Sequence, residues 1–207
     1  MEHYYSENPE SESNEKEITY EINDKKFKFI SDNGVFSKGH VDFATDFMLR
    51  TILKDKINGK VLDMGCGYGV IGITISKLCS EVSKVVMCDI NNRAVDLSKR
   101  NVENNKVVNA EVMASNGFEN VKDKFDVIIT NPPIRAGKAV IYKMYEDAKS
   151  HLNDGGKFYL VINKKHGAPS TINYLNEIYS DVEVLDKKAG FNVIRCIGNA
   201  WLFWKNY

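Results

Sequence analysis

The chain has 207 residues, of which 43% are hydrophobic, and its 28 basic residues balance 28 acidic ones, so the formal net charge is zero. That balance is typical of one globular domain with a buried core. No apolar stretch approaches the roughly 18 residues that span a bilayer, and the N-terminus lacks a signal-peptide pattern, so we expect a cytoplasmic protein without a membrane partner.

Charge is unevenly distributed along the chain. Residues 1–17 contain six glutamates and one lysine, which leaves 27 basic and 22 acidic residues in the remainder, a surplus of about five positive charges. We expect residues 1–16 to form a flexible acidic tail because they are polar and contain Ser, Asn and Pro. The basic surplus elsewhere is compatible with an RNA substrate.

The first predicted element is a β-hairpin. Residues 17–22 and 25–30 alternate polar and apolar residues around Asn23-Asp24. We therefore divide the single domain expected over 17–207 into a hairpin, 17–33, and a core, 34–207. Apolar residues at helical spacing from Phe43 to Leu53 then predict a helix that Asn58-Gly59 ends.

Strands and helices alternate through the rest of the chain. The predicted strands cover 61–64, 85–88, 110–113, 125–130, 157–162, 182–185 and 193–203, and the predicted helices cover 70–78, 91–104, 140–152 and 172–179. We expect Asn153 to Gly156 to close the third of these helices. This alternation predicts an α/β fold with a mostly parallel sheet that helices cover on both faces. Only a turn around Ala189-Gly190 separates the last two strands, so the final strand should run antiparallel.

The four cysteines show no pattern of a metal site. Cys66, Cys79, Cys88 and Cys196 form no CxxC pair and no cluster with histidine at metal-ligand spacing. We expect no metal and no disulfide, and interpret the cysteines as reduced thiols, three of them within apolar segments.

A glycine-rich turn follows the strand 61–64. Gly67 to Gly72 match the dinucleotide pattern GxGxxG, with Asp89 about twenty residues further on. Asp63, however, lies at the end of the strand just before the glycine-rich turn, and its carboxylate would repel a pyrophosphate. It suits a cofactor with a cationic amino group and a sulfonium, such as S-adenosylmethionine, and Asp89 can accept hydrogen bonds from both ribose hydroxyls. The alternative is that Asp63 only caps the following helix.

At this point the chain resembles the class I S-adenosylmethionine-dependent methyltransferases. Residues 61–69 look like their first motif and residues 88–90 like their acidic second motif. The resemblance covers roughly residues 34–203 and implies a Rossmann-like methyltransferase fold, a seven-stranded mostly parallel sheet with an antiparallel last strand. It implies cofactor contacts from the residues Asp63, Gly65, Cys66, Gly67, Asp89, Ile90, Ser115, Asn116 and Asn131.

The second constellation is Asn131-Pro132-Pro133-Ile134, directly after the strand 125–130. Ligands of open α/β sheets bind at this edge. The two prolines fix φ and expose carbonyl groups, and Asn131 adds a side-chain acceptor, so together they can hold both hydrogens of a flat NH₂ group. Such hydrogen bonds strengthen as the nitrogen becomes tetrahedral during methyl transfer. The alternative is an ordinary turn after a strand.

This tetrad resembles the Asn-Pro-Pro-aromatic motif of amino-group methyltransferases, which implies a catalytic role for Asn131, Pro132, Pro133 and Ile134. The chain departs from the motif at Ile134, where the aromatic residue would stack on the base. Stacking is worth about 1–3 kcal/mol per base. Another side chain must therefore supply the stacking surface, or Ile134 must pack on the ring.

Two segments resemble the small-subunit ribosomal RNA guanine-N2 methyltransferases, in particular their short single-domain homologues. They are residues 34–37, followed by Asp42, and residues 131–138. The resemblance implies that Phe36 and Ser37 lie near the cofactor and close its pocket; the alternative is a hydrophobic plug. Arg135, Lys138 and Lys164 are candidates for contacts with RNA, although each is also explained as a solvated charge.

We therefore predict transfer of a methyl group to an exocyclic amino group, guanine N2 of ribosomal RNA, by a monomer or weak homodimer. One alternative is methylation of a protein glutamine, as in release-factor methyltransferases. Alternatives of another class are a non-catalytic nucleotide-binding module and an NAD-dependent oxidoreductase, against which Asn131 and Asp63 respectively argue.

Overall fold

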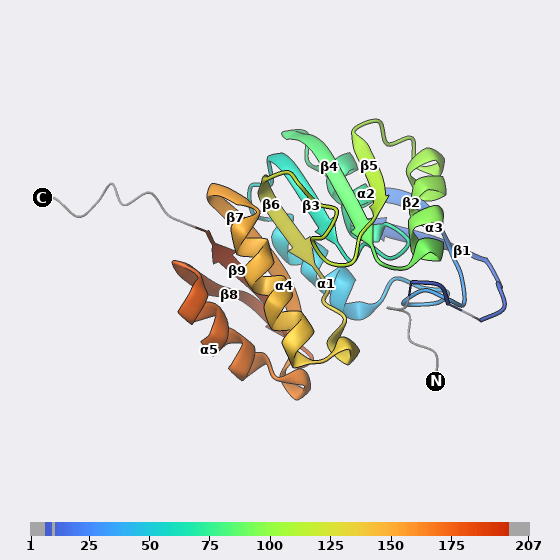
Figure 1. Cartoon of the computed structure of the whole chain (residues 1–207). Helices are drawn as coiled ribbons and strands as arrows, with labels where there is room; N and C mark the ends of the chain where they lie inside the picture. The colour runs from blue at the N-terminus through green and yellow to red at the C-terminus, as the bar shows by residue number, and fades with distance from the viewer. Residues whose placement is uncertain (1–6, 10, 199–207) are drawn as a thin grey trace, which may run out of the picture.

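A seven-stranded sheet forms the centre of the computed structural model, which describes residues 7–9 and 11–198 (Figure 1). The strands follow the order β5 (Ala110–Ala114), β4 (Val82–Asp89), β3 (Gly59–Met64), β6 (Phe125–Thr130), β7 (Leu152–Asn163), β9 (Phe191–Ile197) and β8 (Asp181–Lys188). The pairs from β5 to β7 are parallel, while β9 is antiparallel to both β7 and β8. The predicted antiparallel last strand is thus confirmed, and it lies between two earlier strands.

Helices cover both faces of the sheet. The helices α1 (Phe43–Ile52), α2 (Val70–Leu78) and α3 (Asn92–Asn104) lie on one face, and α4 (Lys138–Ser150) and α5 (Ala168–Ile178) on the other (Figure 1). Neighbouring residues of β3 divide between the two cores, because side chains alternate along a strand: Val61 packs with the first set of helices and Leu62 with the second.

The connections of β3 position the functional site. β3 pairs with β4 on one side and with β6 on the other, so the chain winds outward from it in both directions. Loops that leave the two neighbouring strands diverge at this switch point, which opens a crevice at the carboxyl ends of the strands.

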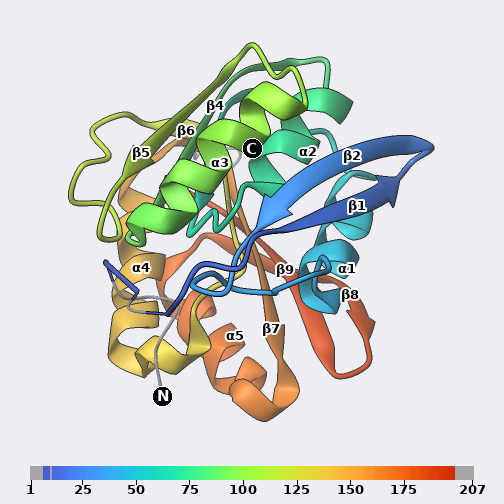
Figure 2. The ribbon, with the colours of Figure 1, turned by 90° about the vertical axis from the view of Figure 1, so that its right-hand side faces the viewer.

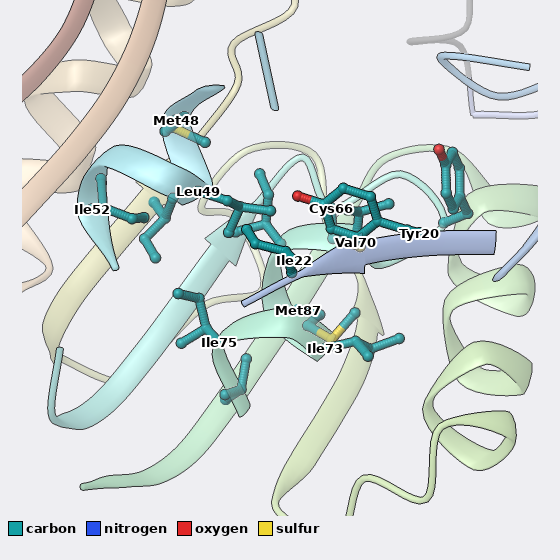
Figure 3. Close-up of a cluster of buried hydrophobic side chains, with 14 of the residues drawn as sticks. Tyr20, Ile22, Met48, Leu49, Ile52, Cys66, Val70, Ile73, Ile75 and Met87 are labelled. Carbon is teal, nitrogen blue, oxygen red and sulfur yellow. The ribbon is translucent and has the colours of Figure 1, made fainter. Parts of the chain in front are cut away.

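The N-terminal hairpin of β1 (Lys16–Ile22) and β2 (Lys25–Ser31) is antiparallel, as predicted, and packs beside α1 and α3 (Figure 2). Its buried face contributes Tyr20 and Ile22 to the core between the sheet, α1 and α2 (Figure 3). The hairpin is therefore part of the main hydrophobic core.

Two asparagines of the α3 region bind the outer edge of β2. Ile30 N donates to Asn101 Oδ1 at 2.7 Å, and Asn101 Nδ2 donates to Ile30 O at 2.9 Å and to Tyr68 O at 2.8 Å. Asn105, one turn later, makes the same pair of bonds with the backbone of Lys28. The carboxamides take the place of a neighbouring strand, so the edge of the hairpin is satisfied.

Described residues of the expected acidic tail contact α3 and the loop after β2. Asn92 N donates to Glu7 O at 3.0 Å, and Arg93 donates to Pro9 O at 3.3 Å and to Ser11 O at 2.9 Å. Glu15 forms a two-bond ion pair with Arg100. Residues 1–6 and 10 lie outside the described residues.

The predicted element boundaries are wrong in the region of α4 and β7. The third predicted helix was expected to run to residue 152 and close at 153–156, but α4 ends at Ser150 and β7 already begins at Leu152. Leu152 pairs with Phe125, and the register then shifts before Val127 pairs with Lys157. The glycines that indicated a loop thus form an irregularity within the strand. Of the predicted last strand, residues 199–203 lie outside the described residues.

We predict that Asn101→Ala lowers the free energy of unfolding by about 2–4 kcal/mol, because Asn101 is fully buried and the backbone groups of Ile30 and Tyr68 lose their partner. Asn105→Ala, at a more exposed position, is the matched control and should cost about 1 kcal/mol. Urea denaturation of both variants measures the difference, and equal losses would contradict the prediction.

Candidate active site

A cavity of about 960 Å³ opens at the carboxyl ends of β3, β4, β5 and β6. Its walls come from the loops after these strands, from α4 and from the loop before α1. The predicted site residues that line it are Phe36, Ser37, Gly65, Cys66, Gly67, Asp89, Ile90, Ser115, Asn116, Asn131, Pro132 and Pro133. The predicted site residues that do not line it are Asp63, Ile134, Arg135, Lys138 and Lys164.

The glycine loop presents a bare backbone surface to this cavity. Gly65, Gly67 and Gly69 have positive φ angles of 71°, 56° and 97°. A Cβ atom on Gly65 or Gly67 would meet no atom within 4 Å, whereas one on Gly69 would lie 2.8 Å from Met87 Cε. Gly69 therefore permits α2 to pack on β4, and the first two glycines leave open space in which a ligand can approach the backbone.

Asp63 lies fully buried beside the loop. Its Oδ2 accepts a hydrogen bond from Gly72 N at 2.8 Å, and its Oδ1 has no partner among the described residues. Gly72 belongs to the first turn of α2, whose N-cap, Gly69, has no side chain to offer, so the bond is the helix-capping role. Burial is the main reason that the pKa of Asp63 is raised to about 7. The hydrogen bond from Gly72 lowers this pKa, and the charge of Asp89 raises it.

Asp89 connects the second strand of the site to the glycine loop. Its Oδ2 accepts from Gly67 N at 2.8 Å and its Oδ1 from Asn91 N at 2.9 Å. Burial raises the pKa of Asp89, while the N–H groups of Asn91, Gly67 and Ile90 oppose that rise. An ionised carboxylate has about four acceptor sites, so both oxygens keep capacity for a ligand that enters the cavity.

The loop before α1 closes one side of the cavity. Asn91 Nδ2 donates to Gly34 O at 2.7 Å, which ties the loop to the start of α3. Ser37, in the left-handed region with φ 61°, donates from Oγ to His40 O at 2.6 Å. Phe36 remains 41% exposed at the rim. Phe36 and Ser37 are thus part of the cavity wall.

Ser115 and Asn116 follow β5 on the opposite side. Ser115 Oγ donates to Gly117 O at 2.7 Å and accepts from Asn120 N at 3.1 Å. Asn116 Nδ2 donates to Glu119 Oε1 at 3.0 Å. These side chains order their own loop, so the surface they offer to the cavity is shaped by a rigid turn.

A second pocket of about 540 Å³ adjoins the cavity. The two spaces share the wall residues Val35, Phe36, Ser37, Asp42, Asn131 and Pro132. Asn131 therefore lies where the two spaces meet. Its Nδ2 donates to Thr45 Oγ1 at 3.0 Å, which fixes the orientation of the carboxamide. Sequence reasoning missed Thr45, because nothing in the local pattern of α1 marks it.

The second pocket has a partly basic lining. It is lined by the predicted residues Ile134 and Arg135 and also by Lys38, His166 and Phe191, which were not among the predicted site residues. Two of the predicted RNA contacts lie elsewhere: Lys138 Nζ is 4.9 Å from the centre of the Tyr142 ring, and Lys164 lines neither space. The basic residues that adjoin Asn131 are thus partly different from those predicted.

Within residues 7–9 and 11–198, no three His, Cys, Asp or Glu side chains are grouped as a metal ion would require, and the four cysteines are free thiols. No helix of the described part of the chain is long and apolar enough to cross a membrane.

Three known proteins are similar to this chain in sequence or in structure. The uncharacterized protein YbxB of Bacillus subtilis is 41% identical over 196 residues, 94% of this chain and 97% of that protein. Ribosomal RNA small subunit methyltransferase C of Haemophilus influenzae (strain PittGG) is 37% identical over 164 residues, 77% of this chain but 48% of that protein. A solved structure of the T. thermophilus 16S rRNA N2 G1207 methyltransferase in complex with AdoMet and guanosine is 26% identical, with a TM-score of 0.79.

That structural match covers 89% of this chain and 51% of the T. thermophilus chain, so this chain spans about half the length of both ribosomal RNA methyltransferases. The fold of this chain is the predicted Rossmann-like methyltransferase fold with an antiparallel last strand and an N-terminal hairpin. A family model described as the methyltransferase small domain matches residues 26–195. The chain therefore belongs to the methyltransferase small domain family.

Proposed function

We propose that the protein is an S-adenosylmethionine-dependent methyltransferase that acts on an exocyclic amino group, the N2 group of guanine in ribosomal RNA. The observation that carries the proposal is the position of Asn131 on the wall between two adjoining pockets. The cavity of about 960 Å³ is large enough for a nucleoside cofactor, and an acceptor in the second pocket would contact the carboxamide of Asn131.

The larger cavity is the cofactor site. Its fit to S-adenosylmethionine rests on the open backbone of Gly65 and Gly67, on the carboxylate of Asp89, and on the unpartnered Oδ1 of Asp63. When bound, the cofactor supplies a methyl group activated by its sulfonium. Asp89 would hold the ribose hydroxyls, and the turn at Ser115 and Asn116 would border the adenine, since all three residues line the cavity.

Asp63 acts on the cofactor through its charge. Since its carboxyl group does not line the cavity, it favours a cationic amino group there by electrostatic attraction in a poorly hydrated site. The same carboxylate caps α2 through Gly72. The capping and the cofactor role are therefore compatible, because accepting the bond from Gly72 leaves the negative charge of the ionised carboxylate in place.

Asn131 and the prolines hold the acceptor. Thr45 binds the amide nitrogen of Asn131, so the carboxamide oxygen is at the end left for the acceptor NH₂. In this position Asn131 and the prolines would present the acceptor nitrogen to the methyl group that S-adenosylmethionine would supply. Their carbonyl oxygens would accept the hydrogen bonds of the NH₂ group. Alignment is the main task of these residues.

Guanine in ribosomal RNA is supported by the relatives. Ribosomal RNA small subunit methyltransferase C shares 37% identity, and the T. thermophilus structure, at 26% identity, holds AdoMet and guanosine. Arg135 and Lys38 supply positive charge beside the acceptor pocket, where phosphates of an RNA strand would lie. Ribosomal RNA would be met in the cytoplasm, and one chain carries every residue assigned to the site.

We expect tritiated methyl groups to pass from S-adenosylmethionine to ribosomal RNA isolated from a strain that lacks the protein. After digestion to nucleosides, the label should be found in N2-methylguanosine. The controls are a release factor and ribosomal RNA from the parent strain, which contains the protein; neither should take up label. Label in protein glutamine or in another nucleoside would contradict the proposed acceptor.

Cofactor affinity should rise about fivefold between pH 6 and pH 7. The pKa of Asp63 is raised to about 7, so its ionised fraction increases from roughly a tenth to a half over this interval, and only the ionised form attracts the amino group. Calorimetry with S-adenosylhomocysteine measures the affinity. Asp63→Asn keeps an acceptor for Gly72 but has no charge, so its affinity should be weaker and independent of pH in this range.

Asp126→Asn is the matched control for that experiment, because its carboxylate binds Lys60 N and Asn153 away from the cavity lining. This control should retain the pH-dependent rise. A rise that persists in Asp63→Asn would show that another group is responsible.

We predict that Asn131→Ala keeps the cofactor affinity and lowers kcat by about a hundredfold or more, the cost of losing one aligned hydrogen-bonding group in an active site. Thr45→Val removes the acceptor that orients Asn131 and should lower kcat less, by about tenfold, while Thr45→Ser restores it. Single-turnover rates and calorimetry separate chemistry from binding. Unchanged turnover in Asn131→Ala would contradict the assigned role.

A further inference from the structure

The outer wall of the second pocket comes from an unexpected part of the chain. Pro9 and Ser11, from the segment before the hairpin, line the pocket together with Phe36, Asn131 and Arg135. Pro9 also packs closely against the loop before α1, since a Cβ atom on Gly34 would lie 2.9 Å from Pro9 Cγ. The N-terminal segment thus faces the pocket at which the acceptor is proposed to bind.

Arg93 is the main anchor of this segment. Its guanidinium donates to Pro9 O and Ser11 O, and its Nη1 lies 3.3 Å from Asp32 Oδ2. Its side chain is only a quarter exposed, so these bonds are partly shielded from water. Because one guanidinium binds the segment and the start of the loop before α1, it holds both walls of the pocket in one arrangement.

Contacts besides those of Arg93 also hold this N-terminal segment. Asn92 binds the backbone of Glu7 and, through Nδ2, the side chain of Asn8 at 3.0 Å. Asn33 Nδ2 donates to Glu12 O at 3.2 Å, and Asn14 N donates to Asp32. These hydrogen bonds hold the segment in place beside the pocket.

We propose that Pro9 and Ser11, held by Arg93, form the outer wall of the acceptor pocket and restrict it to a single unpaired nucleotide. The proposal rests on the proposed function. A pocket of about 540 Å³ suits one small ligand, and a base within a duplex cannot reach Asn131 without leaving its stack. Lys38 and Arg135 supply the positive charge for the phosphate of that nucleotide.

Filling the pocket from this wall tests the proposal. Ser11→Trp should raise KM for ribosomal RNA from a strain that lacks the protein at least tenfold, while the affinity for S-adenosylhomocysteine stays within twofold. Glu12→Trp is the matched control, because Glu12 is the next residue, is exposed and does not line the pocket. It should change neither quantity. Equal KM values for the two variants would overturn the proposal.

A smaller substitution gives a readout that does not depend on turnover or on tolerance of a tryptophan. The thiol of Ser11→Cys should react more slowly with N-ethylmaleimide when guanosine 5′-monophosphate and S-adenosylhomocysteine are present, and that of Glu12→Cys should not. Equal protection at both positions, or none at Ser11→Cys, would overturn the proposal. Methyl transfer to ribosomal RNA by the unaltered protein tests the proposed function separately, because it does not depend on Ser11.

Discussion

The parallel pairing of β3 with both β4 and β6 is the constraint on which the site depends. Met64 pairs with Cys88 on one side and with Thr130 on the other, and Thr130 Oγ1 donates to Met64 O at 2.8 Å. The residues that follow these strands therefore begin at one level of the sheet. Gly65 N and the next N–H both donate to Cys88 O, so the glycine loop starts as an extension of the same ladder. A shift of one residue in either pairing would move Asp63 and Asp89 out of line with Asn131.

The sequence predicted those parts of the molecule that depend on neighbouring residues. Strand and helix positions followed from periodicity, and the loop after each strand was expected at the same edge because parallel strands share their direction. Asp89 and Asn131 were predicted for that reason. The start of β7 was not, because the glycines after Leu152 have the same appearance in a loop and in a strand irregularity.

Contacts between distant segments could not be predicted. Thr45 and Asn131 are 86 positions apart, and Arg93 and Ser11 are 82 apart. Neither pair has a local pattern that marks it. The same holds for Asn101, which has the properties of an ordinary polar helix residue until β2 is placed beside it. For Asp63, sequence reasoning offered cofactor binding or helix capping as alternatives, and the geometry assigns capping to one oxygen only.

The insertion of β9 between β7 and β8 bears on synthesis of the chain. β7 ends at Asn163, but the strand that pairs with its outer edge begins only at Phe191. Until that segment leaves the ribosome, β7 has an open edge that contains the apolar residues Phe158 and Leu160. Exposed apolar edges pair readily with other chains. A nascent or prematurely terminated chain is therefore most prone to aggregate in this interval. The residues of the cofactor cavity have then been synthesised, but β9 has not yet paired with β7.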